Sequence, residues 1–196
     1  EQSLMRALIS SAEQGVDRCH CVSYQDDGAL LEELFTRDGS GSLIAQDTYD
    51  QMRTASIDDA GGILELIEPL ENNGILVKRS RELLENEIDH FTVIEKDGMI
   101  IGCAALYPYP DEKLGEVACV ATHPDYRGGR RGLRLLDALQ QQANANKLKQ
   151  LFVLTTVTAH WFQEQGFVEG SIDKLPEKKQ FLYNYQRNSK LFYKAI

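Results

Sequence analysis

The stretch from Gly115 to Leu136, GEVACVATHPDYRGGRRGLRLL, constrains the fold of this chain more than any other. Its apolar residues predict a half-buried strand from Glu116 to Thr122, which ends at His123-Pro124. A loop rich in glycine and arginine, Arg127 to Gly132, follows and leads directly into an amphipathic helix. This order predicts a site for an anion such as phosphate, because the first turn of a helix has unpaired N–H groups and partial positive charge.

The loop itself contains two kinds of residue that suit phosphate. Glycine lets the backbone approach closely, and arginine adds side-chain donors. The glycines are Gly128, Gly129 and Gly132, and the arginines are Arg127, Arg130 and Arg131. The stretch resembles the acyl-CoA binding motif of the GCN5-related N-acetyltransferases, Arg/Gln-x-x-Gly-x-Gly/Ala, whose loop wraps the pyrophosphate of coenzyme A. Arg130 stands where that family usually has glycine, so the rest of the chain has to support the resemblance.

Length and charge limit what the chain is expected to do. Its 196 residues are enough for one domain with a sizeable core and a substantial appendage. A net charge of −9 and a pI near 5.0 argue against non-specific nucleic-acid binding. An anionic ligand would therefore need a local group of arginines to hold it. We find no long apolar run and no leader-like start, so no membrane association and a cytoplasmic location are expected.

The four cysteines do not indicate a metal site. Cys19, Cys21, Cys103 and Cys119 lack the paired spacing of zinc ligands. Cys103 and Cys119 lie on apolar strands and are expected to be small core residues. The Cys19-His20-Cys21 segment has no second cluster to complete a site, so no metal is predicted.

Residues 1–47 do not read as a self-sufficient domain. Helices are expected from Leu4 to Gln14 and from Ala29 to Phe35, with a short strand from His20 to Tyr24 between them. The segment GALLEELFTRDGSGSLI resembles the C-terminal end of an amino-acid kinase domain. The resemblance implies that residues 1–47 are a remnant of such a domain, or a linker. A helical leader that packs on the main domain is the alternative.

Residues 48–196 predict a mixed α/β domain. Ser56 and Ser80 mark helix starts, Pro69 is expected to end or bend the first helix, and Asp97-Gly98 joins the strands of a clear hairpin. The order from Tyr49 reads β-α-α-β-β-β-α-β-α-β-β. That order matches the acetyltransferase fold, an α/β (α+β) structure in which a mixed central sheet has helices on both faces.

A second motif supports the same resemblance. Many members of the superfamily carry Ala-x-x-Phe-Tyr-x-x-x-Gly-Phe, in which the tyrosine often protonates the departing thiolate. Here the segment from Ala159 to Phe167 reads AHWFQEQGF, and Phe162 occupies the tyrosine position. The motif therefore supports the fold and the cofactor while it removes the usual general acid.

Six further segments point to one family within the superfamily. GGILELIEPLENNGILVKRSRE, CAALYP, GEVACVATHP, LFVLTT, HWFQEQGF and YNYQRNSK, in this order, resemble the bacterial N-acetylglutamate synthases that carry a kinase-like domain before the acetyltransferase. The resemblance implies acetyl transfer from acetyl-CoA to the α-amine of L-glutamate, in arginine biosynthesis. It also implies that the full-length protein is a homo-oligomer and is inhibited by arginine through the kinase-like domain.

This reaction needs a base, because an amino-acid amine is mostly protonated at neutral pH. The family's base falls on Glu116, whereas without the resemblance a solvent-facing glutamate at the strand end would be preferred. Thr155 takes the position of a hydroxyl residue proposed as proton donor in relatives, and an ordinary strand threonine is an equal alternative. A threonine hydroxyl is a poor acid, so we expect it to relay through water or to orient the thioester sulfur.

The resemblance also assigns binding residues. Backbone groups of Ala118, Cys119 and Val120 should meet the pantetheine arm of coenzyme A. A covalent acetyl-cysteine at Cys119 is less favoured, because direct attack needs no reactive thiol. Arg79 and Arg187 correspond to the family's substrate arginines, and guanidinium groups suit the two carboxylates of glutamate.

Two other functions stay open at this level. One is an acetyltransferase of the same fold that acts on a different small amine. The other is a binding module that senses acyl-CoA or arginine and has lost turnover. We favour glutamate acetylation by direct transfer in a ternary complex, with the loop from Arg127 to Gly132 holding coenzyme A.

Overall fold

The computed structural model describes residues 2–36, 39–45, 50–127, 129–181 and 189–196. The chain divides into two compact units, residues 1–51 and residues 52–196. The boundary predicted after residue 47 falls in a stretch outside the described residues.

The first unit consists of two helices and a small two-stranded sheet. It contains α1 (Gln2–Glu13), β1 (Cys19–Cys21), α2 (Ala29–Phe35) and β2 (Ser42–Ile44). β1 and β2 are antiparallel, and Nδ1 of His20 lies 2.5 Å from Oε1 of Glu33. Glu33 also accepts the backbone N–H groups of Ser40 and Gly41, which fixes the segment that leads into β2. The origin of this unit as a kinase-domain remnant stays a prediction.

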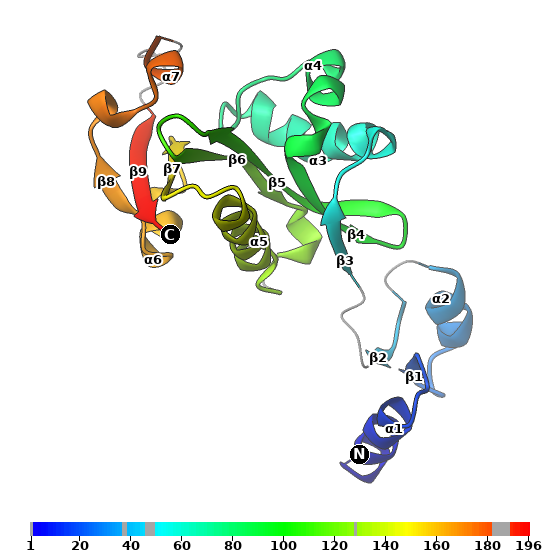
Figure 1. Cartoon of the computed structure of the whole chain (residues 1–196). Coiled ribbons are helices and arrows are strands. Elements are labelled where there is room, and N and C mark those ends of the chain that lie inside the picture. The colour runs from blue at the N-terminus through cyan, green and yellow to red at the C-terminus, as the bar shows by residue number, and fades with distance from the viewer. Residues whose placement is uncertain (1, 37–38, 46–49, 128, 182–188) are drawn as a thin grey trace. The chain divides into compact units, whose positions relative to one another are not determined.

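The second unit contains a seven-stranded mixed sheet (Figure 1). The strands lie in the order β3-β4-β5-β6-β7-β9-β8, and β6 and β7 form a parallel pair. Pairing is antiparallel in the β4-β5, β5-β6, β7-β9 and β8-β9 pairs. The strands are β3 (Gln51–Thr54), β4 (Phe91–Lys96), β5 (Met99–Tyr109), β6 (Leu114–Thr122), β7 (Gln150–Thr155), β8 (Val168–Gly170) and β9 (Lys190–Ala195).

Helices cover both faces of this sheet, as the sequence predicts. They are α3 (Ala60–Asn72), α4 (Arg81–Asn86), α5 (Arg131–Ala145), α6 (Ala159–Glu164) and α7 (Glu177–Phe181), with single 3-10 turns at Ile57–Asp59, Ile88–His90, Pro124–Tyr126 and Ile172–Lys174. α3 packs on β5 and β6 from one side, and α5 packs on β4, β5 and β6 from the other. The order from β3 agrees with the predicted one except for α7, which the sequence analysis did not predict.

Local signals account for the starts of α3 and α4. Ser56 and Asp59 form the predicted capping box, and the Ser80 hydroxyl accepts the N–H of Leu83 at 3.1 Å. Pro69 does not end α3, which continues to Asn72. Proline lacks the N–H that would bond one turn back, and the helix tolerates this loss near its C-terminal end.

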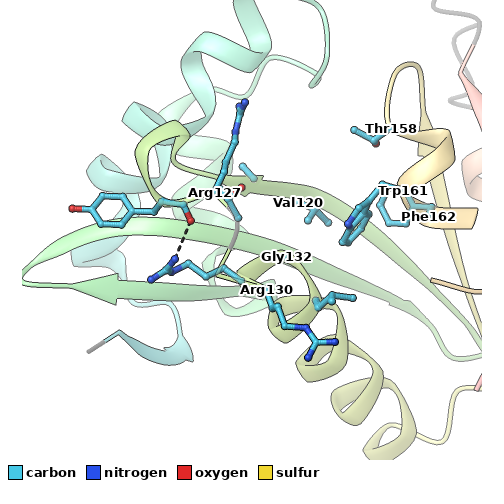
Figure 2. Close-up of a pocket in the computed structure, with 12 residues that line it drawn as sticks. Val120, Arg127, Arg130, Gly132, Thr158, Trp161 and Phe162 are labelled. Carbon is cyan, nitrogen blue, oxygen red and sulfur yellow. Dashed lines mark hydrogen bonds between the residues drawn. The ribbon is translucent and has the colours of Figure 1, made fainter. Parts of the chain in front are cut away.

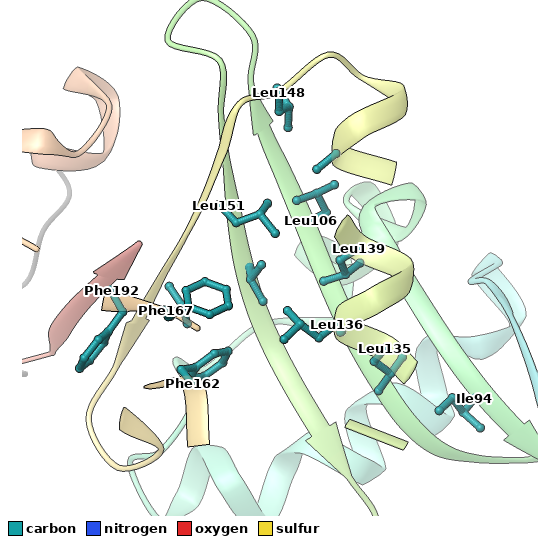
Figure 3. Packing of buried hydrophobic residues seen from close by; sticks show 14 of the residues in the cluster. Ile94, Leu106, Leu135, Leu136, Leu139, Leu148, Leu151, Phe162, Phe167 and Phe192 are labelled. Carbon is teal, nitrogen blue, oxygen red and sulfur yellow. The ribbon is translucent and has the colours of Figure 1, made fainter. Parts of the chain in front are cut away.

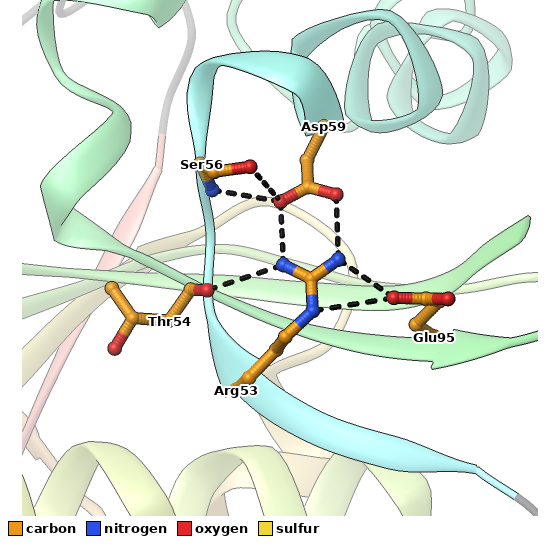
Figure 4. A network of polar contacts seen from close by, with 5 residues as sticks. All are labelled: Arg53, Thr54, Ser56, Asp59 and Glu95. Carbon is orange, nitrogen blue, oxygen red and sulfur yellow. Dashed lines mark hydrogen bonds and ion pairs between the residues drawn. The ribbon is translucent and has the colours of Figure 1, made fainter. Parts of the chain in front are cut away.

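An ionic network fixes β3 to the start of α3 and to β4 (Figure 4). The Arg53 guanidinium donates to both carboxylate oxygens of Asp59, at 2.6 and 2.8 Å, and to Glu95 at 2.7 Å. Asp59 also accepts the backbone N–H of Ser56 at 2.7 Å. The bidentate geometry makes this contact stronger than an ordinary surface ion pair.

The larger core lies between α5 and the sheet (Figure 3). Leu135, Leu136 and Leu139 are fully or almost fully buried on the inner side of α5. They meet apolar side chains of β5, β6 and β7, and the cluster continues to Phe162 in α6 and to Phe167 after that helix. This packing holds the N-terminus of α5 next to the end of β6, where the sequence places its anion site.

Within the described part of the chain, no helix is both long and apolar enough to cross a membrane.

Candidate active site

The site lies where two parallel strands separate. β6 and β7 pair at Leu114–Gln150, Gly115–Leu151 and Glu116–Phe152, and the pairing stops there although both strands continue. A cavity of about 60 Å³ lies beyond this point. It is lined by Ile75, Leu76, Val117, Ala118, Cys119, Val120, Val153, Leu154, Thr155, Thr158 and Phe162. The opening exposes backbone groups of β6 that a paired neighbour would otherwise occupy.

A bulge in β6 lies beside this opening. Ala105 pairs with Ala118 and Cys103 pairs with Ala121, so β6 has one residue more than β5 in this interval. Cys119 has a positive φ of 54°, a conformation that non-glycine residues seldom adopt. The predicted pantetheine-contacting residues are therefore presented by an irregular strand.

Cys119 and Cys103 are both buried, as expected from the sequence. Their thiols interact, and the contact with Cys103 together with the charge of Arg79 lowers the pKa of the Cys119 thiol. The same contact, with burial, raises the pKa of the Cys103 thiol. The sequence contained no cause for a lowered pKa at Cys119, so the structure adds one.

Glu116 is buried rather than exposed at a strand end, which excludes the solvent-facing alternative. Its relative exposure is 6%. Oε1 lies 2.7 Å from Nζ of Lys179 in α7, and Oε2 accepts the hydroxyl of Tyr109 at 3.3 Å. Burial, followed by the nearby charge of Glu116, raises the pKa of Tyr109, so the phenol stays a proton donor in this contact.

Arg79 lies on the same side of the sheet as Glu116. Tyr107 is the cross-strand partner of Glu116, and its hydroxyl donates to Glu87 at 2.6 Å. Burial disfavours the charge on the half-buried Arg79, but the neighbouring Cys119 and Tyr107 outweigh this effect and raise its pKa. The backbone N–H of Arg79 donates to Glu71 at 3.0 Å, which fixes the chain just before the Ser80 cap.

A second and larger cavity, of about 500 Å³, opens at the N-terminus of α5 (Figure 2). It is lined by Val120, Ala121, Thr122, Tyr126, Arg127, Arg130, Arg131, Gly132, Leu133, Thr158, Trp161 and Phe162. Val120, Thr158 and Phe162 line both cavities, so the two adjoin each other. Together they form a continuous path from the basic loop to the opening between β6 and β7.

The three loop arginines have different surroundings. Arg131 donates to the backbone carbonyl of Tyr126 at 2.9 Å and its guanidinium lies 5.7 Å from the centre of the Tyr126 ring. Arg127 and Arg130 are exposed and extend in opposite directions from the loop (Figure 2). Arg131 therefore fixes the loop, while the other two are available to an anion.

Arg130 is the residue immediately before α5, with φ 53° and ψ 18°. This left-handed conformation favours glycine, the residue usual at this position in the family that the loop resembles. The departure in sequence is therefore accommodated without a change in backbone shape. The Arg131 side chain passes close to Gly129, because a Cβ there would lie 2.5 Å from the guanidinium.

Thr155 ends β7, and its hydroxyl faces the turn into α6. Oγ1 accepts the N–H of Thr158 at 3.0 Å and lies 2.8 Å from the Thr158 hydroxyl. Thr155 is buried, whereas Thr158 is exposed and reaches both cavities. The threonine predicted as a hydroxyl donor thus also stabilises the local turn.

Three residues that line the larger cavity were not predicted as site residues from the sequence: Tyr126, Thr158 and Trp161. Trp161 packs edge-on against Phe162, with ring centres 4.8 Å apart. A Cβ on Gly132 would lie 3.3 Å from the indole, so this glycine allows Trp161 to approach α5. A tryptophan next to the phenylalanine of the predicted motif was the available signal.

Two predicted site residues, Gly128 and Arg187, lie outside the described residues. Among the residues that are described, no three His, Cys, Asp or Glu side chains form a group that would hold a metal ion.

Comparison with known proteins defines the class to which this fold and site belong. Residues 87–169 match the acetyltransferase (GNAT) domain family. The chain therefore contains a GNAT acetyltransferase domain, the fold predicted from its sequence. At the level of individual proteins, the chain is similar to amino-acid acetyltransferases.

The relatives that support this assignment are longer proteins. The chain is 56% identical over its whole length to an amino-acid acetyltransferase of Pseudomonas fluorescens and spans 45% of that protein. It is also similar to N-acetylglutamate synthase from Neisseria gonorrhoeae. The structure with coenzyme A and L-arginine matches at 39% identity and a TM-score of 0.82, covering all of this chain and 44% of that one. The structure with coenzyme A and N-acetyl-glutamate matches at 40% identity and a TM-score of 0.74, covering 98% and 46%.

Proposed function

We propose that residues 52–196 transfer the acetyl group of acetyl-CoA directly to the α-amine of L-glutamate. The observation that carries the proposal is the position of Glu116, a buried carboxylate at the point where β6 and β7 separate. A base at that point adjoins the opening in which a thioester would lie. Similarity to a synthase crystallised with coenzyme A and N-acetyl-glutamate supports the choice of both substrates.

Acetyl-CoA would occupy the path formed by the two adjoining cavities. Its phosphates would meet the N–H groups at the start of α5, with Arg127 and Arg130 as side-chain donors. The pantetheine arm would follow the backbone of Ala118, Cys119 and Val120 towards the smaller cavity. The larger cavity, with Arg127 and Arg130 in its lining, suits the charged end of a long ligand, and the smaller cavity suits its thin arm.

Glutamate would bind on the face that carries Arg79. A guanidinium suits a carboxylate because it offers paired donors in one plane. Arg187 is proposed as the second arginine by resemblance alone. With its two carboxylates held in this way, glutamate would direct its α-amine towards Glu116. The α-amine is the group of the substrate that reacts.

The reaction requires a base that takes a proton from the α-ammonium of glutamate and a source that gives a proton to the departing sulfur of coenzyme A. Glu116 would accept a proton from the α-ammonium, directly or through water, and the free amine would attack the thioester carbonyl. The C–N bond forms, the C–S bond breaks, and the thiolate of coenzyme A takes up the second proton that the attacking nitrogen must lose. Thr155, with Thr158 beside it, would orient the sulfur or relay a proton to it through water. Phe162 has no proton to donate.

Direct transfer is favoured over an acetyl-cysteine intermediate at Cys119. The lowered pKa of this thiol would aid a nucleophile, but Cys119 is 4% exposed and packs in the core against Cys103. Its backbone serves the pantetheine role without any reaction at sulfur. We expect Cys119→Ala to retain turnover, and we expect peptide mass spectrometry to find no acetyl group on Cys119 of the unmodified chain.

The deciding experiment measures thiol release from acetyl-CoA with L-glutamate and with a panel of other amino acids. Glu116→Gln should lower turnover with glutamate at least about tenfold, as expected for loss of a general base. Glu112→Gln, an exposed glutamate before the same strand, should leave turnover unchanged. Equal turnover of Glu116→Gln and the unmodified chain would exclude Glu116 as the base.

The choice of glutamate over another small amine depends on Arg79. Arg79→Ala should raise the KM for glutamate by at least about tenfold, the effect of losing one hydrogen-bonded charge contact. Arg81→Ala is the matched control, because Arg81 is exposed and pairs with Glu85 one turn along its own helix. An unchanged KM in Arg79→Ala would favour a different amine, and binding of acetyl-CoA without any turnover would favour a sensing module.

Regulation by arginine and self-association are proposed for the full-length protein only. By resemblance, arginine would act through the kinase-like domain. L-Arginine should therefore leave glutamate turnover by this chain unchanged, and inhibition of the chain would contradict the proposal.

A further inference from the structure

A lysine of the chain itself forms an ion pair with Glu116, the predicted base. Nζ of Lys179 lies 2.7 Å from Oε1 of Glu116, and the Lys179 side chain is 27% exposed. We propose that Lys179 lies in the subsite of the acceptor amine and is acetylated there by bound acetyl-CoA when no small amine is present. This inference rests on the proposed function, because it uses the same base and the same acetyl donor.

The chemical identity of the two amines is the first argument. Lys179 has a primary ammonium group, and so does the α-carbon of an amino acid. At 2.7 Å its proton is already within transfer distance of the Glu116 carboxylate. Tyr109 fixes the other carboxylate oxygen, so Oε1 is the oxygen left for an amine, and Lys179 takes it.

Proximity to the opening between the strands is the second argument. Ala118, which lines the smaller cavity, follows Glu116 by two residues in β6, a rise of roughly 7 Å along a strand. An amine at Glu116 is therefore within a short side-chain movement of a thioester in that cavity. The four-carbon stem of lysine is flexible enough for this movement.

The step balances without any further reactant. Glu116 takes a proton from the Lys179 ammonium, and the free Nζ attacks the thioester carbonyl of acetyl-CoA. An N–C bond forms and the C–S bond breaks. The attacking nitrogen gives up its second proton to the departing sulfur, directly or through water, so coenzyme A leaves as a thiol. The product is Nε-acetyl-lysine, which has lost its positive charge and no longer pairs with Glu116.

Lys178 provides an internal control for this proposal. It is adjacent to Lys179 in α7 and is exposed, whereas Lys179 is half-buried. Uncatalysed chemical acetylation favours the more accessible amine, so it would modify Lys178 first. Acetylation guided by Glu116 would modify Lys179 first.

The test incubates the chain with acetyl-CoA that carries a deuterated acetyl group, without an acceptor amine, and follows each lysine by peptide mass spectrometry. We expect Lys179 to be acetylated at least about tenfold faster than Lys178, at a rate independent of protein concentration. L-Glutamate should suppress the reaction, and Glu116→Gln should slow it at least about tenfold at Lys179 alone. Lys178→Arg should leave the rate at Lys179 unchanged.

The inference and the proposed function fail in different ways. Turnover of glutamate combined with equal rates at Lys178 and Lys179 would overturn the inference and leave the function intact. A rate at Lys179 that rises with protein concentration would also overturn it, because one copy would then be acetylating another. Absence of both glutamate turnover and Lys179 acetylation would overturn both.

Discussion

The hydroxyl of Thr155 accepts the backbone N–H of Thr158 at 3.0 Å and lies 2.8 Å from the hydroxyl of the same residue. One side chain therefore closes the turn between β7 and α6 and also presents an O–H group at the cavity that would hold the thioester. The role in the turn is independent of any ligand. The two roles can be separated by measuring stability and turnover on the same variants.

Thr155→Val keeps the shape of the side chain and removes the hydroxyl. We expect the free energy of unfolding to fall by about 1 kcal/mol, because the backbone N–H of Thr158 loses its acceptor. Turnover should fall as well, and Thr155→Ser should restore both. Urea denaturation and thiol release measure the two effects, with the exposed Thr156→Val as control. Full turnover by a destabilised Thr155→Val would restrict Thr155 to a structural role.

Trp161 offers a direct signal for coenzyme A. It is the only tryptophan in the chain, and its indole lines the larger cavity against Gly132. We expect its fluorescence to change saturably when coenzyme A is added, with the same dissociation constant that calorimetry gives. Arg127→Ala should weaken binding without removing the signal. Binding detected by calorimetry with no change in fluorescence would place coenzyme A away from this cavity.

The features that could be predicted from the sequence are those specified by neighbouring residues. Asp97 and Gly98 both have positive φ and join Lys96 to Met99, as a two-residue hairpin turn requires. Ser56 and Ser80 bond within their own first turns. Each of these signals lies within a few residues of the structure that it specifies, so the helices and strands of the second unit follow from them.

The parts that could not be predicted depend on contacts between distant segments. Lys179 reaches Glu116 from a five-residue helix that has too little periodicity to detect. The bulge at Cys119 carries no glycine to mark its positive φ. Gly132 and Trp161 meet only because α5 and α6 pack close together. The anion loop was therefore predicted from its own glycines and arginines and the base from the resemblance, whereas the residues that surround them could not be predicted.

Arg130 combines an unfavourable backbone with a favourable charge. Its φ of 53° strains any residue except glycine, while its guanidinium lies at the predicted phosphate site. Arg130→Gly should be more stable than Arg130→Ala by about 1 kcal/mol, because only glycine relieves the strain. Both variants should bind coenzyme A more weakly, and to a similar extent.

Chemical denaturation and calorimetry on the two variants separate the effects. Equal stabilities of Arg130→Gly and Arg130→Ala would mean that the loop relaxes to another backbone conformation. Unchanged affinity for coenzyme A in both would remove Arg130 from the binding site.

The Arg53–Asp59 contact predicts how stability depends on pH. The hydrogen bonds from Arg53 lower the pKa of Asp59 to about 2, from an ordinary value of 3.8. Because the pKa is lower in the folded state, the contribution to stability is complete above about pH 4 and is lost as the pH falls towards 2. Asp59 is buried and its side chain is 9% exposed, so little of the effect is screened by solvent.

Asp59→Asn should lower the free energy of unfolding at pH 7 by about 2 kcal/mol. Between pH 4 and pH 2 this variant should lose little further stability through position 59, because asparagine has no carboxylate to protonate. The unmodified chain should lose that amount across the same interval, so the two stability curves should converge at low pH. Asp58→Asn is the control, since Asp58 is adjacent and exposed, and its curve should follow that of the unmodified chain. Parallel curves for Asp59→Asn and the unmodified chain would mean that the ion pair adds no pH-dependent stability.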